Sequence, residues 1–159
     1  MNRVAIVTGA ARGIGAACVD ALVGDGYRVV AVDRCRDIPD VPYALATPAD
    51  LEAVVARHGD RALGLVGDVR SAEDMALAVE TAARHFGRLD AVVAAAGVVA
   101  AGGPLWEAGD AAVDAVWSVN VLGTRRPSTR WWAWCARSRW TWPSTASRPT
   151  PSARARRAR

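Results

Sequence analysis

The sequence predicts an α/β fold of the Rossmann type, a doubly wound parallel sheet with helices on both faces. Apolar, strand-like runs alternate with helical patterns over the first hundred or so residues, which is the order expected of crossover units in a parallel sheet. A glycine-rich turn, Thr8-Gly9-Ala10-Ala11-Arg12-Gly13-Ile14-Gly15, joins the first apolar run to the first helical pattern. Several apolar runs are nearly continuous, as in strands covered on both faces.

The expected elements follow one another in regular alternation. Strands are expected at about Arg3–Thr8, Arg28–Asp33, Ala62–Val66 and Leu89–Ala95. Helices are expected at about Gly13–Gly24, Pro48–His58, Ala72–Phe86 and Asp110–Leu122. Thr47 and Ser71 are suited to cap the second and third of these helices. Right-handed crossovers then predict the strand order 3-2-1-4, a sheet truncated after about four strands.

The charge distribution divides the chain at Thr124. Residues 1–124 hold all 16 acidic residues and 10 arginines, whereas residues 125–159 hold 10 arginines and no acidic residue. The second segment contains only Arg, Ala, Ser, Thr, Pro, Trp and Cys, and it shows neither a helical nor a strand period. We therefore expect a dinucleotide-binding portion at 1–124, followed by a tail at 125–159 that is disordered or translated out of frame.

Composition also limits where the protein is expected to work. No apolar run is long enough for a transmembrane helix, and the amino-terminal residues lack the pattern of a signal peptide. The three cysteines are widely spaced and form no metal-binding pattern. We expect a cytoplasmic protein with no metal site and no membrane partner.

The glycine-rich turn is a candidate phosphate site because it lies between a strand and a helix. Gly9 lets the chain leave the strand sharply, Gly13 keeps a side chain away from a pyrophosphate, and Gly15 lets the helix pack close to the strand. The free N–H groups and the positive dipole end of the helix attract phosphates. The backbone around Arg12 and Ile14 would complete the cradle.

A carboxylate is expected at the adenosine end of the same site. Asp33 ends the second strand, where it can accept hydrogen bonds from both hydroxyls of an adenine ribose and repel a 2′-phosphate. This position favours NAD over NADP as the cofactor. The adjacent Arg34 offsets part of the repulsion.

The spacing T-G-x-x-x-G-I-G resembles the cofactor motif of the short-chain dehydrogenase/reductase family, and the resemblance covers residues 1–124. Ala94-Ala95-Ala96-Gly97 stands where that family usually carries N-N-A-G. The resemblance implies that Ala96 and Gly97 lie beside the nicotinamide ribose. It also implies hydride transfer between NAD and a small-molecule alcohol or carbonyl substrate, usually in a homo-oligomer.

Two further segments carry the same resemblance. Asp68 and Val69 close the third strand, where an Asp-hydrophobic pair of the family meets the adenine. The segment Trp117–Thr124 resembles the family's V-N-x-x-G helix. There the asparagine, here Asn120, helps to hold a water molecule of the proton relay.

A narrower resemblance lies in an insertion between the second strand and the following helix. The residues Asp33-Arg34-Cys35, followed by Val41 to Leu51, are similar to the insertion of the mycofactocin-coupled short-chain dehydrogenases. Those enzymes are thought to hold their nicotinamide cofactor without ready exchange. A loop beside the adenosine site is compatible with that property, because it can cover the cofactor.

The remaining catalytic residues of the family are absent from this sequence. The family uses a Ser, a Tyr and a Lys four residues after the Tyr. The chain has no lysine, and its tyrosines, Tyr27 and Tyr43, both precede the third strand. We expect that the chain as written is not a competent dehydrogenase; a cofactor-binding remnant without turnover is the alternative.

A shift of reading frame near Thr124 is the hypothesis that accounts for the tail. In the frame that takes the last base of the preceding codon, every tryptophan codon becomes Leu, Met or Val, which would restore an apolar segment. The rival interpretation is a genuine tail, since arginines interleaved with tryptophans can bind nucleic acid or a membrane surface. We expect no nucleic-acid partner.

Overall fold

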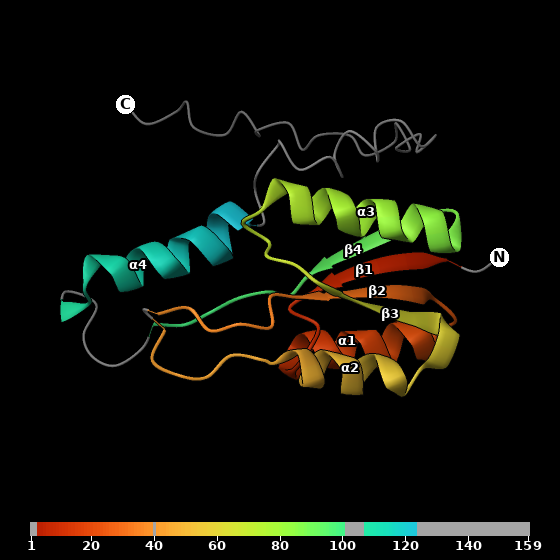
Figure 1. Cartoon of the computed structure of the whole chain (residues 1–159), viewed down its shortest axis with the longest axis horizontal. Helices are drawn as coiled ribbons and strands as arrows, with labels where there is room; N and C mark the ends of the chain where they lie inside the picture. The colour runs from red at the N-terminus through yellow and green to blue at the C-terminus, as the bar shows by residue number, and fades with distance from the viewer. Residues whose placement is uncertain (1–2, 40, 101–106, 124–159) are drawn as a thin grey trace, which may run out of the picture.

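The computed structural model describes residues 3–39, 41–100 and 107–123 (Figure 1). Four parallel strands form one sheet in these residues, in the order β3-β2-β1-β4, which confirms the predicted fold class and strand order. The strands are β1 (Val4–Thr8), β2 (Arg28–Asp33), β3 (Ala62–Val66) and β4 (Ala91–Ala94). The tail predicted at 125–159 lies outside the described residues.

Helices cover both faces of the sheet. They are α1 (Gly13–Gly24), α2 (Pro48–Ala56), α3 (Ala72–Phe86) and α4 (Asp110–Trp117), with a short 3₁₀ turn, η1 (Gly59–Arg61), before β3. Figure 1 shows α1 and α2 on one side of the sheet and α3 on the other. None of the helices in the described ranges combines the length and apolarity needed to cross a membrane.

Alternate side chains of the central strands fill two separate cores. Val4 and Ile6 of β1 pack in the core on the α3 side, which includes Met75. Val7 packs in the core on the other side, with Val19 of α1. All five residues of β1 are buried, as predicted for a strand covered on both faces. The sheet is therefore a rigid base from which the loops at its carboxyl edge extend.

The fourth strand is less buried than the second, although both segments are apolar. Ala91, Val92 and Val93 are only partly buried, and Ala94 is exposed. The reason is that β4 is an edge strand within the described residues, paired to β1 alone. A continuous apolar run therefore did not distinguish a central strand from this edge strand.

The structure confirms the predicted caps of the second and third helices, but the last helix differs from its predicted extent. Thr47 and Asp50 form a reciprocal capping box at the start of α2, and Ser71 accepts a hydrogen bond from the Asp74 backbone N–H. The helix expected at Asp110–Leu122 is α-helical only to Trp117. It continues as a π-helical segment, η3 (Ser118–Leu122), an irregularity often found at functional sites.

Candidate functional site

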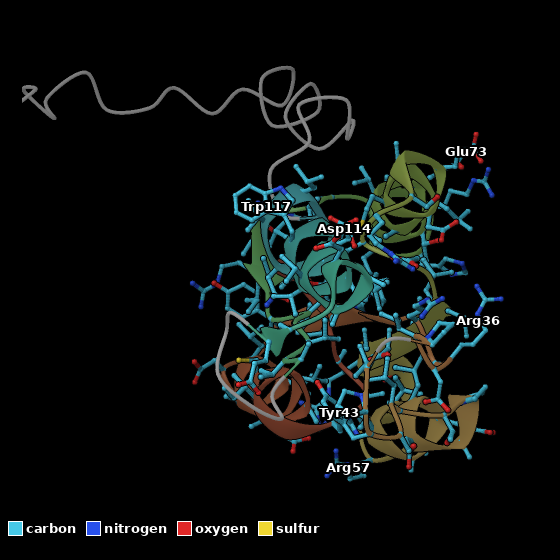
Figure 2. The ribbon with its side chains drawn as sticks, turned by 90° about the vertical axis from the view of Figure 1, so that its left-hand side faces the viewer. Arg36, Tyr43, Arg57, Glu73, Asp114 and Trp117 are labelled. Atoms are coloured by element: carbon cyan, nitrogen blue, oxygen red, sulfur yellow. The ribbon has the colours of Figure 1, made fainter. Side chains whose placement is uncertain are left out.

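A cleft opens at the carboxyl edge of the sheet, where the loops that follow all four strands meet. Figure 2 views the molecule from this side. In open α/β sheets, ligands bind at this edge. Most of the site residues predicted from the sequence line this cleft: Gly9, Arg12, Gly13, Asp33, Asp68, Val69, Ala96 and Gly97.

Gly9 and Gly13, in the turn after β1, are each required to be glycine for a different structural reason. Gly9 has a φ of +66°, and a Cβ there would lie 2.6 Å from the Cα of Ala96, so only glycine allows the two loops to approach. Gly13 has a φ of +57° and faces open space on the cleft. A site for a bulky phosphate group requires such a bare stretch of backbone.

Two predicted residues of the turn do not line the cleft. A Cβ on Gly15 would lie 2.0 Å from the carbonyl oxygen of Gly9, so Gly15 lets the start of α1 pack under the turn. The side chain of Ile14 is 78 % exposed. Gly15 therefore has the packing role that the sequence predicted for it. A contact of Ile14 or Gly15 with a cofactor stays a prediction.

Asp33 braces the glycine-rich turn as well as facing the cleft. Its Oδ2 accepts a hydrogen bond from the backbone N–H of Ala11 at 3.0 Å, and its Oδ1 accepts one from that of Cys35 at 3.1 Å. The carboxylate therefore links the end of β2 to the turn after β1. The sequence placed Asp33 at the cleft but gave no sign of these two contacts.

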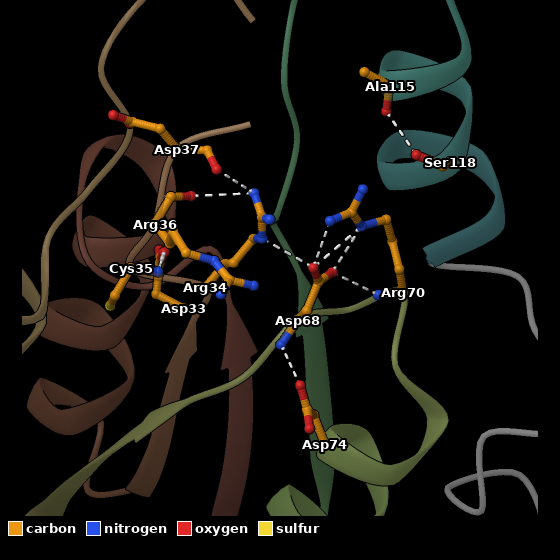
Figure 3. A network of polar contacts seen from close by, with 10 residues as sticks. All are labelled: Asp33, Arg34, Cys35, Arg36, Asp37, Asp68, Arg70, Asp74, Ala115 and Ser118. Atoms are coloured by element: carbon orange, nitrogen blue, oxygen red, sulfur yellow. Dashed lines mark hydrogen bonds and ion pairs between the residues drawn. The ribbon is translucent and has the colours of Figure 1, made fainter. Parts of the chain in front are cut away.

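Asp68 is the centre of a polar network at the end of β3 (Figure 3). Its Oδ2 accepts a hydrogen bond from Nη2 of Arg70 at 2.7 Å and lies 3.0 Å from Nε of Arg34. Its backbone N–H donates to Asp74 at 2.8 Å. Burial raises the pKa of Asp68, but the hydrogen bonds from Arg70 and the charges of both arginines outweigh it, so the pKa is lowered.

Arg34 is held by its own loop as well as by Asp68. Its Nη1 donates to the backbone carbonyls of Arg36 at 3.2 Å and Asp37 at 2.8 Å. Its Nε lies 3.0 Å from Oδ2 of Asp68, so the guanidinium forms an ion pair with that carboxylate. The guanidinium of Arg34 thus lines the cleft with Asp33 while it is engaged by Asp68 and by its own loop. That Arg34 offsets part of the repulsion of a 2′-phosphate by Asp33 stays a prediction.

The insertion after β2 lines part of the cleft and contacts the loops on two sides of it. On one side, Nη1 of Arg12 donates to the carbonyl oxygen of Ala44 at 2.9 Å. On the other side, the hydroxyl of Tyr43 accepts a hydrogen bond from the backbone N–H of Val99 at 2.9 Å. The insertion therefore joins the glycine-rich turn to the loop after β4.

Apolar residues of the insertion pack into the hydrophobic core. Ile38 and Val41 are buried in the same core as Val119 of η3. Ile38 also lines the cleft, and so do Leu45 and Ala46. These lining residues were not predicted. The apolar residues within the insertion were the available signal, but a sequence does not show where a loop folds back.

Asn120 holds the loop after β4. Its Oδ1 accepts a hydrogen bond from the backbone N–H of Val98 at 2.9 Å, and its Nδ2 donates to the carbonyl oxygen of Val98 at 2.8 Å. The Thr8 hydroxyl accepts a hydrogen bond from the backbone N–H of Ala96 at 3.3 Å. These contacts support a loop that has alanines where the family carries asparagines. The role of Asn120 in a proton relay stays a prediction.

The described ranges include the buried thiol of Cys35. They contain no group of three His, Cys, Asp or Glu side chains placed to bind a metal ion. Burial, together with the charges of Asp33 and Asp50, raises the pKa of the Cys35 thiol to about 11. Cys35 therefore stays protonated at neutral pH and is a poor nucleophile.

Comparison with known proteins gives the same family over the described region. The family model described as short chain dehydrogenase matches residues 3–131, seven residues beyond the predicted boundary. An uncharacterised oxidoreductase of Mycobacterium tuberculosis is 42% identical over 125 residues, covering 77% of this chain and 44% of the relative. The cis-2,3-dihydrobiphenyl-2,3-diol dehydrogenase of Paraburkholderia xenovorans is 36% identical over 122 residues, covering 74% and 40%.

Two solved structures share the arrangement described above. Carveol dehydrogenase from Mycobacterium avium, in complex with NAD, aligns with a TM-score of 0.71 and 32% identity, covering 76% of this chain and 45% of its own. A short chain dehydrogenase from Mycobacterium paratuberculosis, bound to NAD, aligns with a TM-score of 0.71 and 35% identity, covering 77% and 46%. The chain spans less than half the length of these relatives.

Proposed function

Because the chain belongs to the short-chain dehydrogenase family, we propose that the cleft at the carboxyl edge of its sheet binds NAD. The observation that carries this proposal is the position of Asp33 in the same cleft as the bare backbone of Gly13. One offers a carboxylate for ribose hydroxyls, and the other leaves room for a pyrophosphate. The NAD-bound relatives of similar fold support the same cofactor.

Each part of the cleft has a proposed role in holding the cofactor. The turn from Gly9 to Gly15, with the backbone at Arg12 and Ile14, would hold the pyrophosphate at the N-terminus of α1. Asp68 and Val69 would flank the adenine, and Ala96 and Gly97 would lie beside the nicotinamide ribose. When bound, NAD supplies a hydride acceptor for an alcohol substrate.

This chain's own residues would bind the cofactor rather than complete the reaction. The 159 residues contain no lysine and hence no Tyr-x-x-x-Lys motif. Asn120 is the one residue of the proton relay that the sequence suggests. Its side chain holds Val98, so its direct effect is to fix the loop beside Gly97. We propose that these residues form the cofactor half of an enzyme acting on an alcohol/carbonyl pair.

We also propose that the chain resembles the mycofactocin-coupled subgroup in retaining its cofactor. The support is the insertion after β2, which is anchored on both sides of the cleft by Arg12 and Tyr43. A bound dinucleotide would leave only after one of these anchors breaks. Exchange of cofactor is therefore expected to be slow compared with a cleft that lacks the insertion.

For the tail, we propose translation out of frame from near residue 124. The support is the abrupt loss of acidic residues and of Val, Leu and Ile after that point. Sequencing the gene and its flanks tests this proposal. An aliphatic-rich continuation in another frame, with the missing Tyr and Lys, is expected; a gene with no such continuation in any frame would contradict it.

Two measurements on the purified chain test cofactor binding and turnover independently. NADH binding is followed by the cofactor's fluorescence, and NAD reduction is followed with a panel of secondary alcohols. We expect binding without turnover. Measurable turnover by the 159-residue chain would show that the missing Tyr and Lys are not required.

A further inference from the structure

Two charged side chains of opposite sign follow one another at the end of β2. The carboxylate of Asp33 and the guanidinium of Arg34 both line the cleft. A cofactor with a free ribose 2′-hydroxyl suits the carboxylate, whereas a 2′-phosphate suits the guanidinium. Which cofactor the cleft prefers depends on which of the two charges is available.

The arrangement in Figure 3 makes the charge of Arg34 the less available one. Its Nη1 is occupied by two backbone carbonyls, and its Nε lies 3.0 Å from Oδ2 of Asp68. The side chains of Arg34 and Asp68 are each only 19% exposed. An ion pair so shielded from water is stronger than an exposed one and holds the guanidinium in place.

Asp68 is in turn held in a fixed position. Its carboxylate accepts hydrogen bonds from the side chain and the backbone N–H of Arg70, and its own backbone N–H donates to Asp74. The carboxylate therefore cannot follow Arg34 if that side chain turns toward the cleft. The carboxylate of Asp68 therefore keeps the guanidinium of Arg34 at the end of β3.

We propose that Asp68 is a positioning residue for cofactor selectivity, which holds Arg34 back so that Asp33 alone meets the ribose 2′ position. This inference rests on the proposed binding of NAD in the cleft. Without the carboxylate of Asp68, Arg34 would keep the two hydrogen bonds of its Nη1, but its charge would no longer be paired. The guanidinium could then form a charge-assisted hydrogen bond with a 2′-phosphate through its other nitrogen atoms. Such a bond is worth about ten-fold or more in affinity.

The test compares the dissociation constants of NADH and NADPH, measured by fluorescence titration of the purified chain. The quantity of interest is the ratio Kd(NADPH)/Kd(NADH), because a general loosening of the cleft changes both constants together. Asp68→Asn is expected to lower this ratio about ten-fold or more. The double variant Arg34→Met/Asp68→Asn is expected to return to the wild-type ratio, because the freed cation is gone.

Two further single variants test the inference even if Asp68→Asn does not fold. Arg34→Met is expected to change the ratio less than about two-fold, since an engaged guanidinium contributes little to either cofactor. Asp74→Asn also removes one negative charge from the network. Asp74 accepts a hydrogen bond from the backbone N–H of Asp68 and does not contact Arg34 in the described network. The ratio Kd(NADPH)/Kd(NADH) of this variant is therefore expected to stay at the wild-type value.

The outcomes separate this inference from the proposed function. An unchanged ratio in folded Asp68→Asn, or a ratio that rises ten-fold in Arg34→Met, would overturn the role of Asp68 while NADH binding stands. A folded wild-type chain that binds neither cofactor would overturn the proposed function, and the inference with it.

Discussion

The phenolic oxygen of Tyr43 lies 2.9 Å from the backbone nitrogen of Val99 and accepts its hydrogen bond, although 56 residues separate the two along the chain. This contact ties the insertion after β2 to the loop after β4. With the bond from Arg12 to the carbonyl of Ala44, it anchors the insertion on both sides of the cleft. Single substitutions can remove either contact, which makes the proposed retention of the cofactor testable.

Replacing Tyr43 by Phe removes one anchor and leaves the ring in place. Loss of one hydrogen bond, about 0.5–1.5 kcal/mol, is expected to speed NADH dissociation about two- to ten-fold. Stopped-flow displacement of bound NADH by excess NAD measures this rate. Tyr27→Phe is the matched control, because Tyr27 packs under Arg3 at the amino end of β2. Equal dissociation rates for Tyr43→Phe and wild type would show that the insertion does not retain the cofactor.

Gly13→Ala is expected to weaken NADH binding about ten-fold or more and to lower the stability of the chain by about 1–2 kcal/mol. The left-handed backbone at Gly13 costs an alanine about 1–2 kcal/mol, and the added methyl group would occupy the bare stretch proposed for the pyrophosphate. Gly24→Ala is the control, because Gly24 ends α1 in open space without a positive φ. The control is expected to leave binding unchanged and to stabilise the chain by up to about 1 kcal/mol. Equal NADH affinities for the two variants would remove Gly13 from the site.

Asp33→Asn is expected to lower both stability and NADH affinity. The amide can accept only one of the two backbone hydrogen bonds that the carboxylate accepts from Ala11 and Cys35, so unfolding in urea should become easier by about 1–2 kcal/mol. NADH should bind about ten-fold more weakly, with NADPH less affected. Loss of stability with unchanged affinity would mean that Asp33 only braces the turn.

The stability of the chain is expected to fall in acid partly because of Asp90. Its Oδ2 accepts a hydrogen bond from the backbone N–H of Val4 at 2.8 Å. Burial raises the pKa of Asp90, but the hydrogen bonds from Arg88 and Val4 outweigh it, so the pKa in the folded chain is lowered. A lowered pKa means that the stabilisation is complete above the unfolded value, about 3.9, and is lost as pH falls through the folded value.

Asp90→Asn measures that contribution. The variant is expected to be less stable than wild type by about 1–3 kcal/mol at pH 7, and the difference should shrink as pH falls below about 4. Urea unfolding followed by circular dichroism at a series of pH values gives both free energies. A difference that does not depend on pH would show that the charge of Asp90 has no part in it.

The fold was predictable because local signals and the order of elements agreed. The alternation of strands and helices gave the strand order, and Thr47 and Ser71 gave helix starts that the structure confirms. The burial of β4 does not follow from its apolar residues alone. An apolar run is the same in a central strand and in an edge strand, and only pairing distinguishes them.

The candidate site was predictable residue by residue but not contact by contact. Asp33 was placed at the cleft from its position at the end of a strand, and Asp68 from the resemblance to the family. The engagement of Arg34 by Asp68 was not foreseen, because residues that close two different strands meet only once β2 and β3 pair in register. The contact of Asn120 with Val98 likewise depends on how η3 packs against the loop after β4.

The measurement that tests the central claim most directly is a titration of the purified 159-residue chain with NADH, followed by the fluorescence of the cofactor. We predict saturable binding at one site, with a dissociation constant of about 1 µM to 1 mM. NAD should displace the bound NADH, and binding should be weakened in Gly13→Ala but not in Gly24→Ala. A folded chain that gives no saturable signal, or one whose binding is the same in both variants, would contradict it.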